Sequence, residues 1–164
     1  MSRTRSNALS ATKVLGPRVQ FSRHLRQEAK RFGILSISAT PEDYHALRTI
    51  LNDPLWQIAK AGTCKEAIAR LGRKHVPVVV VCECNLPDGS WRDILNHMIE
   101  LADPPVLIVT SRLADERLWA EVLNLGGFDV LAKPFRESEV KYAVTAACRQ
   151  KRTPVLRQAF VVST

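Results

Sequence analysis

The chain has 164 residues, of which 46% are apolar and 24% are charged, and its formal net charge is +8. This length and composition are typical of one globular domain with a sizeable core and exclude a wholly disordered chain. No apolar run approaches the ~18 residues needed to cross a bilayer, and the N-terminus lacks the apolar stretch of a secretory signal, so we expect a cytoplasmic protein.

The positive charge is concentrated at the two ends of the chain. Residues 1–31 hold eight Lys or Arg and one Glu, and residues 149–164 hold four Lys or Arg and no acid, whereas residues 32–148 hold twelve basic and fifteen acidic residues. We therefore divide the chain into a basic N-terminal extension at 1–31 with a short helix at 19–31, a domain at 32–150, and a C-terminal tail at 151–164. The basic ends either contact an anionic partner or are solvated flanks.

The domain alternates apolar runs with segments of helical periodicity, which gives five strand–helix pairs. The continuous β-branched run of the third strand is typical of a strand buried on both faces of a parallel sheet. Residues 85–89 are expected to form a loop because of their Asn, Pro, Asp and Gly content. The strands are expected over 33–38, 55–61, 76–82, 104–110 and 128–132. The first helix is expected to begin at Thr40-Pro41 and the second at Thr63, and the other three are expected over 90–102, 112–125 and 137–149.

This alternation predicts an α/β fold, an open, doubly wound parallel sheet with helices on both faces. Ligands of such sheets bind beyond the carboxyl ends of the strands. The residues expected there are Ser38, Ala39, Thr40, Glu83, Thr110, Ser111 and Lys133.

Several enzyme classes lack their sequence motifs. The chain has no G-x-G-x-x-G for a dinucleotide, no G-x-x-x-x-G-K-[ST] for nucleotide phosphates and no G-x-S-x-G hydrolase elbow. The four cysteines follow neither a zinc nor a disulfide pattern, and we interpret them as buried apolar side chains. We therefore expect a protein that is not an enzyme and has no small-molecule substrate.

Over residues 32–150 the sequence resembles the receiver domain of two-component response regulators. The resemblance depends on the run from Glu83 to Gly89, on Thr110 at the end of a strand, on Gly126-Gly127, and on Lys133-Pro134-Phe135. It implies a flavodoxin-like sheet with strand order 2-1-3-4-5. It also implies that the position of Glu83 belongs to an Asp that accepts a phosphoryl group from a histidine kinase.

The resemblance also shows where this chain departs from the family. In the family, two acidic residues at the end of strand one hold Mg²⁺, but here Ser38 and Ala39 occupy those positions. In strand five, Val130 replaces the aromatic switch residue of the family. Glu42 and Asp43 lie nearby, in the first turn of the first helix, and we interpret them as favouring its dipole. Mg²⁺ needs oxygen ligands that include carboxylates, so we expect neither Mg²⁺ nor another cofactor.

The hypothesis is a degenerate receiver (a pseudo-receiver) that acts without phosphorylation. In it, Glu83 forms an ion pair with Lys133 and has Thr110 as a neighbour, and its permanent charge either imitates the phosphorylated state or serves structure alone. Two alternatives stay open: an unusual phosphoacceptor, with Glu83 or the displaced Asp88 accepting the group, and binding of nucleic acid or an anionic membrane surface through the basic ends.

A protein partner in a signalling pathway is expected, and a homodimer is a further expectation. In the family, partners dock on the face formed by helix four, strand five and helix five. The residues that match this face are Arg112, Arg117, Val130, Lys133, Arg136 and Lys141.

Overall fold

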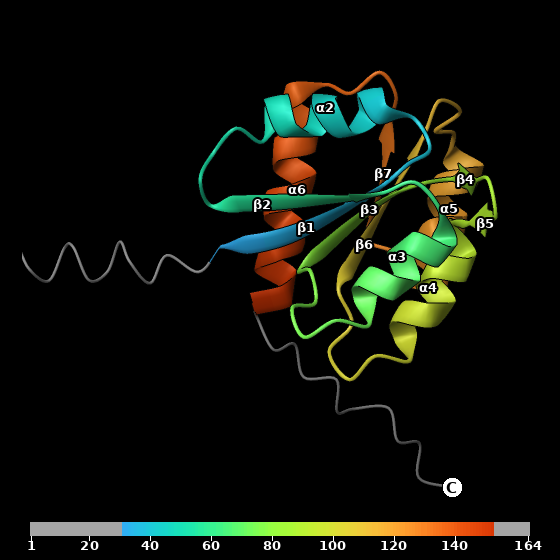
Figure 1. Ribbon diagram of the computed structural model, residues 1–164. Helices are drawn as coiled ribbons and strands as arrows, with labels where there is room; N and C mark the ends of the chain where they lie inside the picture. The colour runs from blue at the N-terminus through green and yellow to red at the C-terminus, as the bar shows by residue number, and fades with distance from the viewer. Residues whose placement is uncertain (1–30, 153–164) are drawn as a thin grey trace, which may run out of the picture. The chain divides into compact units, whose positions relative to one another are not determined.

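The computed structural model describes residues 31–152 (Figure 1). The predicted N-terminal extension and its helix at 19–31, apart from Arg31, lie outside the described residues, as does the tail from residue 153 onward. The last helix extends to Arg152, so residues 151 and 152 belong to it rather than to a tail. Within residues 31–152, no helix is both long enough and apolar enough to span a bilayer.

Five parallel strands form the main sheet in the order β2-β1-β3-β6-β7, which is the predicted order 2-1-3-4-5 of the principal strands. The central strand β3 is buried along most of its length because both of its faces are covered, as its β-branched residues predict. The strands are β1 Phe32–Ile37, β2 Trp56–Ala61, β3 Val79–Glu83, β6 Val106–Ser111 and β7 Asp129–Ala132.

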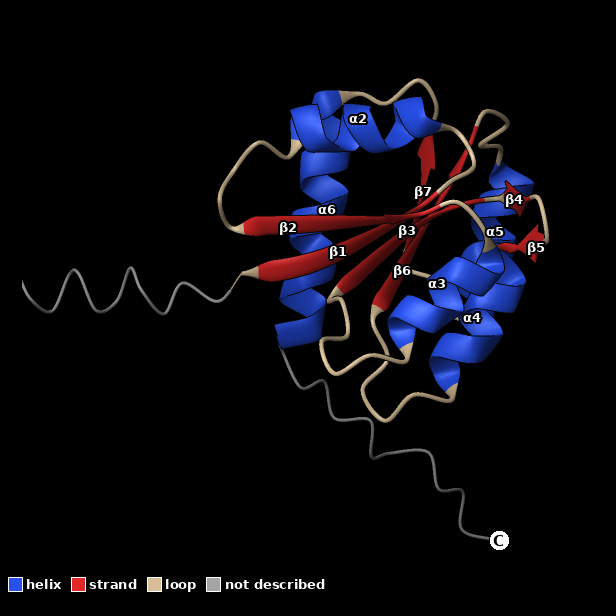
Figure 2. Cartoon of the chain, in the orientation of Figure 1, coloured by secondary structure: helices blue, strands red, loops and turns tan. Residues whose placement is uncertain are grey.

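Helices cover both faces of this sheet, as predicted (Figure 2). On one face, α2 Pro41–Ile50 and α6 Glu137–Arg152 pack through Leu47, Val140 and Val144 against strand residues such as Val79. On the other face lie α3 Cys64–Leu71, α4 Trp91–Ile99 and α5 Glu116–Leu125. Their apolar side chains, including Ala67, Ile94, Met98 and Val122, form the second half of the core with Val80 and Leu107.

Two local predictions are wrong. Residues 85–89 were expected to be a loop, but β4 Asn85–Leu86 pairs with β5 Gly89–Ser90 in a short antiparallel hairpin. Strands of two residues are too short to produce an alternating pattern in the sequence. Helix α5 begins at Glu116 rather than at residue 112, because the carboxylate of Asp115 accepts a hydrogen bond from the backbone N–H of Leu118 and caps the helix there.

Candidate functional site

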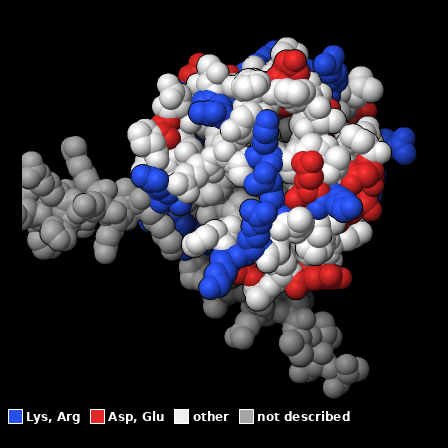
Figure 3. Space-filling view, viewed as in Figure 1, with Lys and Arg blue, Asp and Glu red and all other residues white. Residues whose placement is uncertain are grey.

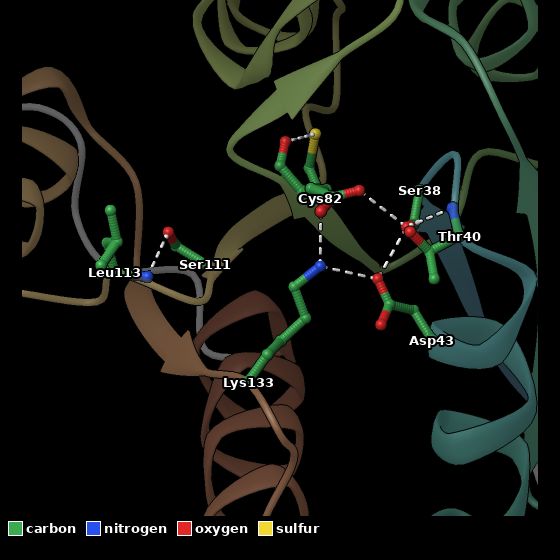
Figure 4. A network of polar contacts seen from close by, with 8 residues as sticks. Ser38, Thr40, Asp43, Cys82, Ser111, Leu113 and Lys133 are labelled. Atoms are coloured by element: carbon green, nitrogen blue, oxygen red, sulfur yellow. Dashed lines mark hydrogen bonds and ion pairs between the residues drawn. The ribbon is translucent and has the colours of Figure 1, made fainter.

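The carboxyl ends of β1, β3 and β7 bring together the polar residues that the sequence placed at strand ends. Ser38 follows β1, Glu83 ends β3, and Lys133 follows β7. Figure 4 shows the Lys133 amine pointing toward the carboxylate of Asp43, and Asp43 in turn lying beside Ser38. These four residues, Ser38, Asp43, Glu83 and Lys133, are called the acidic pocket below.

Lys133 lies at the centre of the acidic pocket. Its Nζ atom is 2.5 Å from Glu83 Oε1 and 2.8 Å from Asp43 Oδ2. The side chain of Lys133 is only 6% exposed, and those of Asp43 and Glu83 are 14% and 21% exposed. Burial alone would lower the pKa of Lys133, but the hydrogen bonds and charges of Asp43 and Glu83 outweigh it and raise that pKa above 10.5. The ion pair predicted between Glu83 and Lys133 is therefore present.

Asp43 is the residue of this pocket whose role the sequence analysis missed. It does lie in the first turn of α2, where its charge favours the helix dipole, but its carboxylate also binds Lys133 and Ser38. Glu42, beside it, is exposed. The available signal was the position of Asp43 five residues after the strand end at Ser38, close enough for its side chain to reach back over the sheet edge.

Ser38 links the two carboxylates. Its Oγ atom lies 2.7 Å from Asp43 Oδ2 and 2.9 Å from Glu83 Oε2, and it accepts a hydrogen bond of 3.0 Å from the backbone N–H of Thr40. A hydroxyl carries one proton, so Ser38 donates to one carboxylate at a time. Ala39 is exposed and has no polar side-chain atom to add to the pocket.

Thr110 is the neighbour of Glu83 that the sequence predicted. The two residues are paired in the register of β3 and β6, and Thr110 is buried. The carbonyl of Thr110 also accepts a hydrogen bond of 2.8 Å from the N–H of Cys84. The Ser111 hydroxyl instead accepts a hydrogen bond from the N–H of Leu113, in the segment that leads to α5 (Figure 4).

Asp88, considered as a displaced phosphoacceptor, holds the start of α3. Its two carboxylate oxygens accept hydrogen bonds from the backbone N–H groups of Cys64 and Lys65, at 2.7 and 3.0 Å. Hydrogen bonds from Lys65 and Cys64 lower the pKa of this exposed carboxyl. Asp88 therefore has a structural role that is separate from the acidic pocket.

The residues expected on the partner face differ in how they are paired. Arg112 and Arg117 are exposed, and neither forms an ion pair within residues 31–152. Arg136, just before α6, pairs with Glu139 at 3.3 Å, and Lys141 pairs with Glu137 within α6 at 2.5 Å. Val130 is half-buried and packs against the core between the sheet and α3–α5.

A cavity of about 460 Å³ opens beside Lys133, between the start of α2 and the segment that joins β7 to α6. Within the described part of the chain, no three or more His, Cys, Asp or Glu side chains are grouped so that they could hold a metal ion. The cavity is lined by Thr40, Glu42, Asp43, Ala46, Arg112, Lys133, Pro134 and Phe135.

A family model and several curated proteins match this chain, and all of the ones described below are response regulators or transcriptional regulatory proteins. Residues 34–145 match the response regulator receiver domain family. The transcriptional regulatory protein KdpE of Mycobacterium tuberculosis is 29% identical over 131 residues, which cover 80% of this chain and 57% of KdpE. The probable transcriptional regulatory protein TcrX of the same organism is 39% identical over 97 residues, which cover 58% of this chain and 40% of TcrX. The chain thus spans about half the length of the curated relatives it matches.

Solved structures show the same fold. The signal receiver domain of a putative Luxo repressor protein from Vibrio parahaemolyticus superposes with a TM-score of 0.70 at 20% identity, covering 79% of this chain and 98% of that one. The receiver domain of the Francisella response regulator 1452 superposes with a TM-score of 0.65, also at 20% identity, covering 73% of this chain and 98% of that one.

Proposed function

This chain belongs to the response regulator receiver domain family of two-component signalling, and from that premise we propose that it is a receiver that acts without phosphorylation. In this proposal it is a protein-interaction module rather than an enzyme, and Glu83 stands where the family has its phosphoacceptor Asp. The observation that supports it most directly is the position of Lys133 Nζ, within 2.8 Å of the carboxylates of both Asp43 and Glu83.

The residues of the acidic pocket do not fit Mg²⁺. This ion requires near-octahedral oxygen ligands at roughly 2.0–2.1 Å and usually one or two carboxylates. The pocket has two carboxylates, from Asp43 and Glu83, but both bind the Lys133 ammonium, and Ser38 and Ala39 supply no further charged oxygen. We therefore propose that the lysine ammonium is the resident cation of this pocket and that the protein uses no metal.

Glu83 is also poorly placed to act as a nucleophile. Phosphoryl transfer needs a carboxylate oxygen that is free to approach phosphorus in line with the leaving group. Oε1 of Glu83 is held at 2.5 Å by Lys133, and Oε2 lies 2.9 Å from the Ser38 hydroxyl. The contact with Lys133 fixes the orientation of the Glu83 carboxylate, so an in-line attack would require this carboxylate to move.

The proposal is tested by incubating the chain of residues 1–164 with acetyl phosphate and Mg²⁺ and measuring its intact mass. We expect no phosphoryl adduct at any Mg²⁺ concentration, because both carboxylates of the pocket already bind the Lys133 ammonium. A Mg²⁺-dependent adduct on Glu83 or Asp88 would contradict the proposal and establish an unusual phosphoacceptor.

In this proposal, the charge of Glu83 keeps the partner face in one state. The pocket carries two carboxylates and one ammonium, so a negative charge remains beside Lys133 without any phosphate. The partner face lacks the family's aromatic switch because its position is Val130, which is half-buried in the core. Removing the charge with Glu83→Gln is expected to speed amide hydrogen exchange over residues 112–125. Unchanged exchange there would show that the pair serves structure alone.

The proposed partner is a protein of a bacterial signalling pathway that meets this module in the cytoplasm. Arg112 and Arg117 are the exposed cations of the partner face without an ion pair in the described chain, so they are the ones available to an acidic group on the partner. Arg136 and Lys141 are less available, because each already binds a glutamate of α6.

A further inference from the structure

Two consecutive stretches of the described chain differ in their balance of charge. Residues 44–78 hold six Lys or Arg and two acids, whereas residues 79–148 hold six Lys or Arg and eleven acids. None of the six cations in the first stretch forms an ion pair within the described residues. These six, called the basic band below, are Arg48, Lys60, Lys65, Arg70, Arg73 and Lys74.

The two acids of this stretch form no ion pair with the basic band within the described residues, and both bind backbone N–H groups. Asp53 Oδ1 accepts a hydrogen bond of 2.8 Å from the N–H of Leu55, and Glu66 Oε2 accepts one of 2.8 Å from the N–H of Gly62. The stretch therefore keeps an excess of four positive charges (six cations less two acids), and its cations remain available to a ligand.

The basic band lies along one edge of the sheet. Arg48 is on α2, Lys60 is on the edge strand β2, and the other four are on α3 or in the segment that follows it. Figure 3 shows a run of Lys and Arg side chains down the middle of one face, with Asp and Glu side chains beside it. All six are exposed except Arg70, which is half-buried. Arg48 and Lys60 both lie over the ring of Tyr44, at 5.7 and 5.6 Å from its centroid.

The ends of the described chain lie close to this edge. Phe32 is the first residue of β1, and its ring packs against Trp56 with 5.5 Å between the two ring centroids. The guanidinium carbon of Arg152 lies over the Phe32 ring, 5.6 Å from its centroid. The chain thus enters and leaves the domain beside the first residue of β2. Residues 1–30, which are joined here, add seven Lys or Arg and one Glu to the sequence.

We propose that the basic band is a binding surface for the phosphodiester backbone of nucleic acid. Nucleic acid is bound without regard to sequence when cations of the protein neutralise its phosphates. Most of the binding free energy then comes from the release of counterions that had been condensed on the nucleic acid, so unpaired cations along one edge suit such a contact.

The composition of the band favours nucleic acid over a membrane or a protein. Insertion into a membrane interface uses apolar side chains as well as charge, and the core of a protein interface is apolar. The large apolar side chains with the greatest exposure lie elsewhere, on α4, α5, α6 and the segment before α5. They are Ile99, Leu113, Trp119, Leu125 and Tyr142, with exposed fractions of 50% or more.

The experiment compares two triple variants of the full chain that lose the same charge. The band variant is Lys60→Gln/Arg73→Gln/Lys74→Gln, and the control variant is Arg117→Gln/Arg136→Gln/Lys141→Gln, whose residues are equally exposed but lie on α5 and in or just before α6. Binding to a short fluorescein-labelled DNA duplex of mixed sequence is followed by fluorescence anisotropy over a range of NaCl concentrations. Urea unfolding of each variant checks that it is folded.

The wild-type chain is expected to bind DNA with an affinity that falls steeply with salt. The band variant should lose about tenfold or more in affinity at ~100 mM NaCl, and its slope of log K against log salt should be smaller by about 2–3, because each phosphate contact contributes about 0.9. The control variant should lose less than about twofold by the same argument. An equal loss in both variants, no loss in the band variant, or no salt-dependent binding by the wild type would overturn the proposal. Binding that depends on the band but occurs only with phosphatidylglycerol vesicles would overturn it in favour of a membrane.

Discussion

Lys133 Nζ lies 2.5 Å from Glu83 Oε1, although the two residues are 50 positions apart in the sequence, and it lies 2.8 Å from Asp43 Oδ2 on a third element of the fold. A single ammonium thus joins the ends of β3 and β7 to the first turn of α2. Charges that are this little exposed are stable only when they are paired. Removal of the ammonium should therefore lower the free energy of unfolding of the whole domain.

Replacing Lys133 with Met is expected to lower the free energy of unfolding by about 2–4 kcal/mol, because it leaves two mostly buried carboxylates without a counter-charge. Glu83→Gln should cost less, since Lys133 then keeps its contact with Asp43. Urea unfolding at neutral pH measures both values. The matched control is Lys141→Met, which breaks an exposed ion pair on α6 and should change stability much less. Equal losses for the two lysine variants would show that the acidic pocket is not a centre of stability.

The raised pKa of Lys133 gives a second prediction, for alkaline pH. In the folded protein this pKa lies above 10.5, because Asp43 and Glu83 favour the charged form more strongly than burial disfavours it. The stabilisation by Lys133 is therefore complete below the unfolded value of about 10.5 and is lost as the pH rises through the higher folded value. The difference in unfolding free energy between wild type and Lys133→Met should be constant from pH 7 to about pH 10 and shrink above that. A difference that already shrinks near neutral pH would contradict this assignment.

The strands and the open parallel sheet were predictable because they depend on local patterns, whereas the strand order came from the resemblance to the receiver family. The run at Val79–Glu83 is β-branched and buried, and the alternation of strands with helices leaves few topologies to choose from. The pairing of Glu83 with Lys133 was predictable because parallel strands end at one edge of the sheet. The spacing of Asp43 from Ser38 put the pocket within its reach, but the direction of its side chain depends on tertiary packing, so its contact with Lys133 was missed. The late start of α5 depends on a single capping carboxylate, Asp115, inside a segment that was otherwise helical in pattern.

Asp88→Ala is expected to destabilise the domain without affecting any reaction with acetyl phosphate. The carboxylate of Asp88 satisfies the N–H groups of Cys64 and Lys65, which have no partners within α3 itself. Since these hydrogen bonds lower its pKa, their contribution is present above the ordinary value of about 3.8 and is lost as the pH falls through the lower folded value. Urea unfolding at pH 7 should therefore show a clear loss for Asp88→Ala, and a much smaller one for Glu139→Ala, an exposed carboxylate on α6. Similar losses for the two variants would show that Asp88 is a solvated residue of the hairpin.

Restoring the family's acidic residues is expected to restore phosphorylation only when all of them are present. Glu83→Asp shortens the side chain by one methylene and releases its oxygens from the geometry set by Lys133 and Ser38, yet it adds no ligand for a divalent ion. The triple variant Ser38→Asp/Ala39→Asp/Glu83→Asp adds two carboxylates at the end of β1, which gives Mg²⁺ the charged oxygens it requires.

We therefore expect no adduct from acetyl phosphate and Mg²⁺ with Glu83→Asp, and a Mg²⁺-dependent phosphoryl adduct on residue 83 with the triple variant. Intact mass spectrometry with and without EDTA distinguishes these outcomes, and Ser38→Asn/Ala39→Asn/Glu83→Asp controls for side-chain size without the added charge. Phosphorylation of Glu83→Asp alone would mean that Asp43 already serves as a metal ligand in this pocket. The missing carboxylates at residues 38 and 39 would then not be what separates this chain from a phosphorylated receiver.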